Sequence, residues 1–149
     1  MSYKAIENIT TSKRGNAIEF LFFSKALENG YNISQPLSYD CPYDCILETK
    51  QDKKLLKLQI KRGYDTQSKS DLSFQFNTRS SNPTGNGFTN HSYTKEEIDG
   101  FVVWSDKTPD LFFYVPVEKA SKSKMSIYLG ENPSKQQNYY KNFIFDFTL

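Results

Sequence analysis

The sequence predicts a single α/β domain of 149 residues. Three observations carry this prediction: one segment has apolar residues at helical spacing, several segments alternate apolar and polar residues, and two stretches are almost continuously apolar. Stretches of the last kind are typical of strands in the middle of a sheet that is covered on both faces. A chain of this length can bury one core.

The first expected element is a helix that ends at Asn29. Thr10, Thr11 or Ser12 can cap its start, and Gly30 follows its end, where a glycine commonly stops a helix. Its apolar side chains have the spacing of a face that packs on a sheet, and they are Ala17, Phe20, Leu21, Phe23, Ala26 and Leu27.

A β-hairpin is expected next, with arms at residues 43–50 and 55–62. Apolar and polar residues alternate strictly along the second arm, which is the signature of a strand with one buried face. Residues that are opposite each other in an antiparallel pair share a face. A four-residue loop over residues 51–54 therefore pairs Glu48 with Lys57.

The same register places three polar side chains on one face of the hairpin. Asp44 would lie opposite Lys61, with Cβ atoms about 5 Å apart, and Gln59 would lie beside them on the same face. A carboxylate, an amide and an ammonium thus converge on one patch.

Further strands are expected downstream. Residues 72–76 alternate as a third strand, and residues 77–90 form a long polar loop, which in a compact domain is usually functional. The apolar stretches 98–104 and 111–117 form another strand pair, in which Pro116 marks an edge or a strand end because it lacks a ladder donor.

The tail is expected to contain a short helix at residues 134–142. Four apolar side chains then pack after it, and these are Phe143, Ile144, Phe145 and Phe147.

Composition excludes several classes of protein. No apolar run approaches the roughly 18 residues of a membrane span, and no secretion signal follows the basic start, so we expect a soluble, cytoplasmic protein. Cys41 and Cys45 form one C-x₃-C pair and His91 is the only histidine, so structural zinc lacks its four ligands and reduced core thiols are expected. The net charge is only +2, but basic residues cluster near residues 53–62 and 119–124, as in an electrostatic footprint for nucleic acid.

The patch of Asp44, Gln59 and Lys61 is suited to phosphodiester hydrolysis. Such a site must neutralise phosphate charge and supply a deprotonated water, and Mg²⁺ does both. Mg²⁺ prefers hard oxygen ligands and usually takes one or two carboxylates, so Asp44, the amide oxygen of Gln59 and the carbonyl of Ile60 are candidate ligands. Lys61 can orient or deprotonate the water, or stabilise the developing charge. Each residue also has a plainer interpretation as an ordinary polar strand residue.

These residues resemble the PD-(D/E)XK nuclease superfamily. The resemblance extends upstream to residues 13–19 and downstream to residues 98–104 and 114–117. Within the superfamily the pattern is most similar to homing endonucleases encoded by group I introns of cyanobacterial tRNA genes, which are related to archaeal Holliday-junction resolvases. The resemblance implies a restriction-endonuclease-like core, in which a mixed central sheet is flanked by α-helices.

The same resemblance implies the site. Asp44, Gln59, Lys61 and the helix residue Glu19 are its catalytic residues, and the ligands of the metal are Asp44, Gln59, Ile60 and Glu19. The superfamily usually has Asp or Glu at the position of Gln59, whereas the homing branch is similar in carrying Gln. Mg²⁺ is the implied cofactor, with Mn²⁺ as a substitute.

The implied function is that of a site-specific double-strand DNA homing endonuclease that promotes group I intron mobility. Two alternatives stay open: a Holliday-junction resolvase with the same active site, and a catalytically degenerate DNA-binding protein, which Gln59 keeps in consideration.

The implied partners are double-stranded DNA and further copies of the chain. One domain with a radius of gyration of about 15 Å covers about one turn of duplex and has one site, so cutting both strands needs at least a dimer. The resemblance favours a tetramer. Residues 119–149 are expected to be a C-terminal extension of the 1–149 domain, for DNA contact or oligomerisation.

Seven basic residues are candidates for DNA contact: Arg14, Arg62, Lys69, Arg79, Lys95, Lys122 and Lys124. Arg79 lies in the expected long loop, and arginine pairs bidentately with guanine, so it is the best candidate for reading a base.

Overall fold

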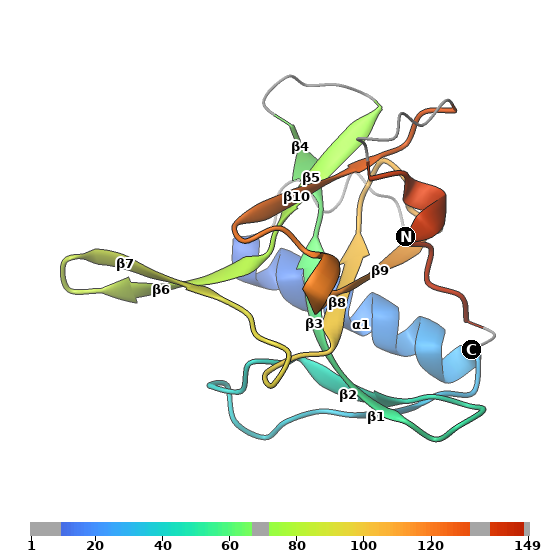
Figure 1. Cartoon of the computed structure of the whole chain (residues 1–149). Helices are drawn as coiled ribbons and strands as arrows, with labels where there is room; N and C mark the ends of the chain where they lie inside the picture. The colour runs from blue at the N-terminus through green and yellow to red at the C-terminus, as the bar shows by residue number, and fades with distance from the viewer. Residues whose placement is uncertain (1–9, 67–71, 132–137, 148–149) are drawn as a thin grey trace.

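The computed structural model describes residues 10–66, 72–131 and 138–147 as layers of secondary structure around a central sheet (Figure 1). Helix α1 (Thr11–Glu28) lies behind this sheet and a smaller sheet lies in front of it. A two-stranded ribbon projects away from the body. No helix in the described residues is both long and apolar enough to cross a membrane.

The central sheet has five strands and both strand directions. Its order is β1 (Asn32–Ser34), β2 (Cys45–Glu48), β3 (Leu55–Arg62), β8 (Gly100–Trp104) and β9 (Phe112–Pro116). Only the pairing of β3 with β8 is parallel. The expected α/β class with a mixed central sheet is therefore confirmed. Strand β1 was not expected, because it has only three residues.

Helix α1 begins and ends close to where the sequence predicts. The side chain of Thr10 accepts a hydrogen bond from the N–H of Lys13, and Gly30 follows the helix with a φ of +82°. The expected apolar face is only partly right. The buried residues are Ile18, Phe22, Phe23 and Ala26, whereas Phe20, Leu21 and Leu27 are exposed. The helix is apolar on more than one side, so spacing did not decide which side packs on the sheet.

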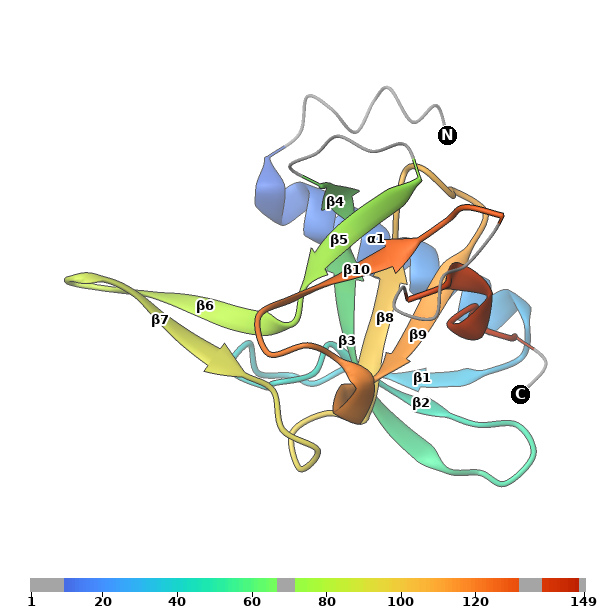
Figure 2. The ribbon, with the colours of Figure 1, turned by 45° about the horizontal axis from the view of Figure 1, so that its top comes forward.

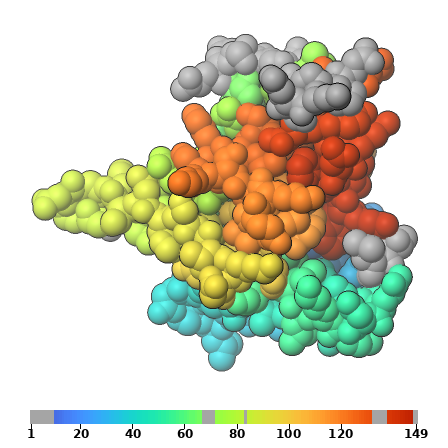
Figure 3. Space-filling model, viewed as in Figure 1, coloured from blue at the N-terminus to red at the C-terminus, as the bar shows by residue number. Residues whose placement is uncertain are grey.

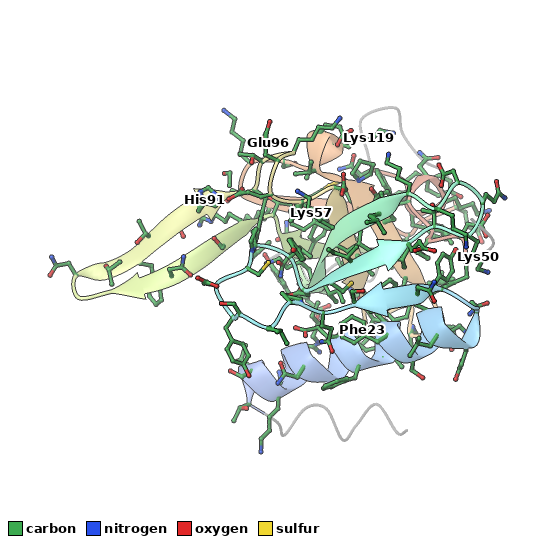
Figure 4. All side chains as sticks on the ribbon, turned by 90° about the horizontal axis from the view of Figure 1, so that it is seen from below. Phe23, Lys50, Lys57, His91, Glu96 and Lys119 are labelled. Atoms are coloured by element: carbon green, nitrogen blue, oxygen red, sulfur yellow. The ribbon has the colours of Figure 1, made fainter. Side chains whose placement is uncertain are left out.

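The two sides of the central sheet have different covers. On the α1 side, Phe23, labelled in Figure 4, belongs to a core cluster with Trp104 and Phe112. On the other side the cover is a three-stranded sheet of β10 (Lys124–Tyr128), β5 (Ser73–Asn77) and β4 (Tyr64–Asp65), seen in front in Figure 2.

This second cover is a sheet, whereas flanking α-helices were expected. The described residues contain one α-helix and two short 3₁₀ helices, η2 (Val117–Lys119) and η3 (Tyr140–Asn142). Strands β5 and β10 alternate buried residues with residues that are partly or fully exposed, so their apolar face covers the sheet without a helix. All of β8 is consequently buried between the two layers.

The hairpin of β2 and β3 has the expected faces but a register that differs by two residues. Cys45 lies opposite Leu58 and Glu48 lies opposite Leu55, so the expected pair of Glu48 with Lys57 is wrong. Asp44, just before β2, donates its N–H to the carbonyl of Leu58, and its side chain accepts from Gln59, whereas we expected Asp44 to lie opposite Lys61.

The turn explains the shift of the hairpin. The N–H of Thr49 donates to the carbonyl of Lys54 over 2.8 Å, and the Thr49 hydroxyl accepts from the N–H of Lys54 and donates to Asp52. Lys53 takes a φ of +56°. These local bonds close the turn over residues 50–53, one residue earlier than predicted.

The expected long loop at residues 77–90 is wrong. Most of it is a β-ribbon of β6 (Arg79–Thr84) and β7 (Gly87–Ser92), joined by Gly85 and Asn86. Two residues that include glycine or asparagine are a usual hairpin connection. Neither face of β7 is buried, so the sequence has no apolar alternation to reveal the strand.

The outer edge of the central sheet is strand β9, which ends at Pro116 as expected. The tail runs along it: the N–H of Tyr114 donates to the carbonyl of Phe143, and the N–H of Phe145 donates to the carbonyl of Phe112. Both tail phenylalanines are buried. Of the expected helix at residues 134–142, residues 134–137 lie outside the described part of the chain.

Candidate active site

The candidate site is formed where α1 meets the open end of the hairpin. Asp44 directly precedes β2, Gln59 and Lys61 lie on β3, and Glu19 lies on α1. All four side chains are partly buried. The structure thus brings together the four residues that the sequence predicts, from helix α1 and from the hairpin of β2 and β3.

The carboxylate of Asp44 is held by β3. Its Oδ2 accepts a hydrogen bond of 2.8 Å from Nε2 of Gln59 and one of 2.6 Å from the N–H of Ile60. The N–H of Asp44 donates to the carbonyl of Leu58 over 2.9 Å. Burial raises the pKa of Asp44, while the bond from Ile60, the charge of Lys61 and the bond from Gln59 lower it. A carboxylate is therefore fixed just before the start of β2.

Glu19 is the second carboxylate of the site. Burial, and then the negative charge of Asp44, raise its pKa from the ordinary 4.5 to about 7. The two carboxylates therefore repel each other in a poorly solvated place, and a cation between them would relieve both effects.

Lys61 faces the same place. Burial lowers its pKa and the charge of Asp44 raises it. Its Nζ lies 5.3 Å from the centre of the Tyr93 ring, within the range of a cation–π contact. The Tyr93 ring also packs edge-on against Phe101 at 5.5 Å. The sequence analysis missed Tyr93, because no spacing relates it to the hairpin and only the fold brings it to Lys61.

The oxygens of the site fit a hard divalent cation. Because a carboxylate can only accept hydrogen bonds, the NH₂ of Gln59 must face Asp44. Oε1 of Gln59 is thereby left as a possible ligand for a cation. The N–H and C=O of one strand residue point to the same edge, so the Ile60 carbonyl faces the edge where Asp44 lies. The described residues contain no group of three or more His, Cys, Asp or Glu side chains that could by themselves hold a metal ion. Two carboxylates, an amide and a carbonyl are a set that suits Mg²⁺.

Cys45 does not add to this set. It is a buried free thiol next to Asp44, and burial and the charges of Asp44 and Glu19 raise its pKa to about 12. At neutral pH Cys45 therefore keeps its proton. Because a metal binds the thiolate and not the thiol, Cys45 is not a ligand here.

A groove of about 530 Å³ opens beside the site. It lies between the start of α1, the end of β3 and the start of β6, and its lining includes Lys61 and three of the predicted DNA-contact residues, Arg14, Arg62 and Arg79. Arg62 also forms an ion pair of 3.1 Å with Asp106. The groove therefore has the charge expected of a surface that receives phosphates.

The remaining predicted contacts lie elsewhere. Lys95 forms an ion pair of 3.6 Å with Glu118, and Lys122 and Lys124 are exposed near the start of β10. None of these three lines the groove. Lys69 lies outside the described residues.

Residues 9–147 match the PD-(D/E)XK endonuclease family. The chain belongs to this family. Membership makes the chain an endonuclease that acts on DNA, and enzymes of this family generally use divalent metal ions.

A solved structure shares this fold. It is that of a bacterial homing endonuclease, I-Ssp6803I, with a TM-score of 0.71 over 91% of this chain and 89% of that one. The two share 19% sequence identity, so they are different proteins and the likeness concerns the fold. The restriction-endonuclease-like core expected from the sequence is confirmed. No curated protein matches this chain.

We expect Glu19 to make the metal-free protein less stable as the pH rises. The folded protein holds this proton more tightly than the unfolded chain does, so the free energy of unfolding should fall between about pH 4.5 and about pH 7. Glu19→Gln should lose less stability than the wild type between pH 5 and pH 8 in EDTA, as measured by urea unfolding. At pH 8, added Mg²⁺ should stabilise the wild type more than the variant. Equal pH profiles would show that burial and the charge of Asp44 do not raise the pKa of Glu19 in the folded protein.

We expect Gln59→Glu to make folding stability depend on metal. The change removes the hydrogen bond to Asp44 and places two carboxylates together, so the free energy of unfolding in EDTA should fall by about 1–3 kcal/mol. Mg²⁺ should restore this loss. The control Gln59→Met also loses the bond but adds no charge, and it should gain no extra response to Mg²⁺. Equal Mg²⁺ responses of the two variants would argue against a ligand at this position.

Proposed function

We propose that the chain is a site-specific double-strand DNA endonuclease of the homing type, which uses Mg²⁺ and serves the mobility of a group I intron. The observation that carries the proposal is the Asp44 carboxylate, held by Gln59 and Ile60 beside Glu19 and Lys61. The adjoining groove with its arginines supports a phosphate backbone as the ligand. The homing role rests on the fold shared with a homing endonuclease and on the sequence pattern.

In this proposal Asp44, Glu19, Oε1 of Gln59 and the Ile60 carbonyl hold the metal ion. When bound, the ion neutralises phosphate charge and lowers the pKa of a water. Gln59 has a second task, because its NH₂ fixes the orientation of Asp44. Arg14 holds the backbone of the DNA in the groove, so that the scissile phosphate lies near Lys61.

Lys61 acts on the phosphate or on the water that attacks it. Its partial burial and the Tyr93 ring limit the positions that its ammonium can take. A positioned ammonium can stabilise the charge that develops on the phosphate oxygens, or orient the attacking water. Burial lowers the pKa of Lys61, which also makes a proton transfer by this group easier.

The proposal includes an assembly of at least two chains, with a tetramer favoured. One copy offers one such site, and each strand of a duplex needs its own cut. Residues 119–149 would then extend the domain toward DNA or another subunit, with Lys122 and Lys124 as exposed cations.

We expect Asp44→Ala to abolish cleavage while DNA binding in EDTA stays equal or becomes tighter, because the change removes a ligand and a negative charge near phosphate. Supercoiled plasmid with Mg²⁺ reports nicking, and fluorescence anisotropy of a labelled duplex reports binding. Cleavage by the variant near the wild-type rate would refute the assigned site. The matched control is Asp110→Ala, an exposed aspartate outside the site.

The same assay can separate homing from junction resolution. A genomic library of linear duplexes should be cut at one sequence. Preferential cutting of a synthetic four-way junction would replace the homing role by that of a resolvase.

A further inference from the structure

The β6–β7 ribbon leaves the body as a separate arm (Figure 3). Its strands have six residues each and pair without a break, from Arg79 with Ser92 to Thr84 with Gly87. Every residue of β7 is exposed, and Phe88 near the tip is 73% exposed. A free β-hairpin of this kind is only marginally stable in water, so the arm depends on how it is held or on what it binds.

The base of the ribbon is fixed to the body. His91, labelled in Figure 4, lies 2.8 Å from a carboxylate oxygen of Glu97, and the hydroxyl of Ser92 donates to the carbonyl of Lys122 over 2.9 Å. The N–H of Thr78 donates to the carbonyl of Ser123 over 3.0 Å. The arm is therefore held in one direction relative to the active site.

One face of the ribbon continues the groove. Because opposite residues share a face, Arg79 and Ser81 on β6 lie on the same face as Asn90 and Phe88 on β7. Arg79, Ser80 and Ser81 line the groove beside Lys61, so the groove leads to the start of the ribbon, where Arg79 and Ser81 belong to this face. The hydroxyl of Ser81 donates to Oδ1 of Asn90 over 2.8 Å, which leaves the NH₂ of Asn90 to donate outward.

The chemistry of the arm selects its partner. Residues 72–95 contain no Asp or Glu, and the ribbon is instead rich in Ser, Thr and Asn, with Arg79 at its base. Such a surface does not repel phosphate and offers donors and acceptors to base edges. The two backbones of a ribbon lie about 4.8 Å apart. With side chains, the ribbon fits the major groove, which is about 12 Å wide, and is too broad for the minor groove of about 6 Å.

We propose that the β6–β7 ribbon enters the major groove of duplex DNA next to the cleaved phosphate, and that Arg79, Asn90 and Phe88 read base edges there. The inference rests on the proposed endonuclease function and adds the element that gives it sequence preference. Arginine recognises guanine, asparagine recognises adenine, and the Phe88 ring contacts a thymine methyl group. The six-residue strands reach about 20 Å, so one arm follows several base pairs.

Binding in EDTA tests the proposal without cleavage, so its result is independent of the catalytic assignment. The probe is a duplex library with 30 randomised base pairs, from which each protein selects its preferred sequences. In a shortened variant, residues 80–91 are replaced by Asn-Gly, which joins Arg79 to Ser92 through a two-residue turn and removes both Asn90 and Phe88. Phe88→Ser is a second variant for which folding of the arm is not at risk. Its matched control is Leu55→Ser, because Leu55 is 59% exposed at the far end of β3.

We expect the shortened arm to lower the preference for the selected sequence over random duplex by about tenfold or more, the effect of one lost bidentate contact. Phe88→Ser should lower it several-fold at thymine positions, and uracil in place of thymine should have the same effect on the wild type. Leu55→Ser should select as the wild type does. Replacing guanine and adenine by their 7-deaza forms removes the N7 acceptors of the major groove, and it should weaken the wild type more than the shortened variant.

Several results would overturn the proposal. One is a shortened variant that keeps its full preference, and another is an equal sensitivity of both proteins to the 7-deaza bases. Selection of no sequence by the wild type would also end the base-reading role. Sedimentation separates the remaining case: if shortening the arm breaks up an oligomer, the ribbon is a contact between subunits.

Discussion

The hydrogen bonds that β3 donates to Asp44 determine where the site lies. Strand β2 begins at Cys45, so the main chain of β2 cannot pair with Ile60, and the side chain of Asp44 accepts that N–H in its place. A partly buried carboxylate thus continues the ladder by one residue and is fixed there. Its burial is unfavourable, as the raised pKa shows, and the bonds from Ile60 and Gln59 offset part of that cost. Without these bonds the carboxylate of Asp44 would no longer be held beside Lys61 and Glu19.

The layers of the fold give this carboxylate its surroundings. Strand β8 is buried on both faces, which makes the centre of the sheet rigid and leaves the chemistry to its margin. Helix α1 brings Glu19 from one side. From the other side, the chain that leaves the β6–β7 ribbon brings Tyr93 to Lys61. The groove with Arg14 and Arg79 begins at the same margin. Ser92 ends the ribbon and Tyr93 contacts Lys61, so adjacent residues set the direction of the ribbon and the position of Lys61.

The sequence predicts the elements that have local signals and the faces of the hairpin. Alternation of period two places Asp44, Gln59 and Lys61 on one face, and a shift of two residues preserves that face, so alternation could not choose between Gln59 and Lys61 as the partner of Asp44. Only the local bonds of Thr49 decide it. The ribbon has no buried face and hence no pattern, although its Gly85-Asn86 turn was a usable signal. The cover by β4, β5 and β10 follows from long-range pairing that spacing does not record.

The central claim is that Asp44, as oriented by β3, and Glu19 bind one metal ion together. The most direct measurement is a crystal structure of the protein with Mn²⁺, in which anomalous scattering identifies the ion. The account predicts one strong peak with Asp44, Glu19 and the Ile60 carbonyl as ligands. A peak that involves neither carboxylate, or no peak at millimolar Mn²⁺, would contradict it.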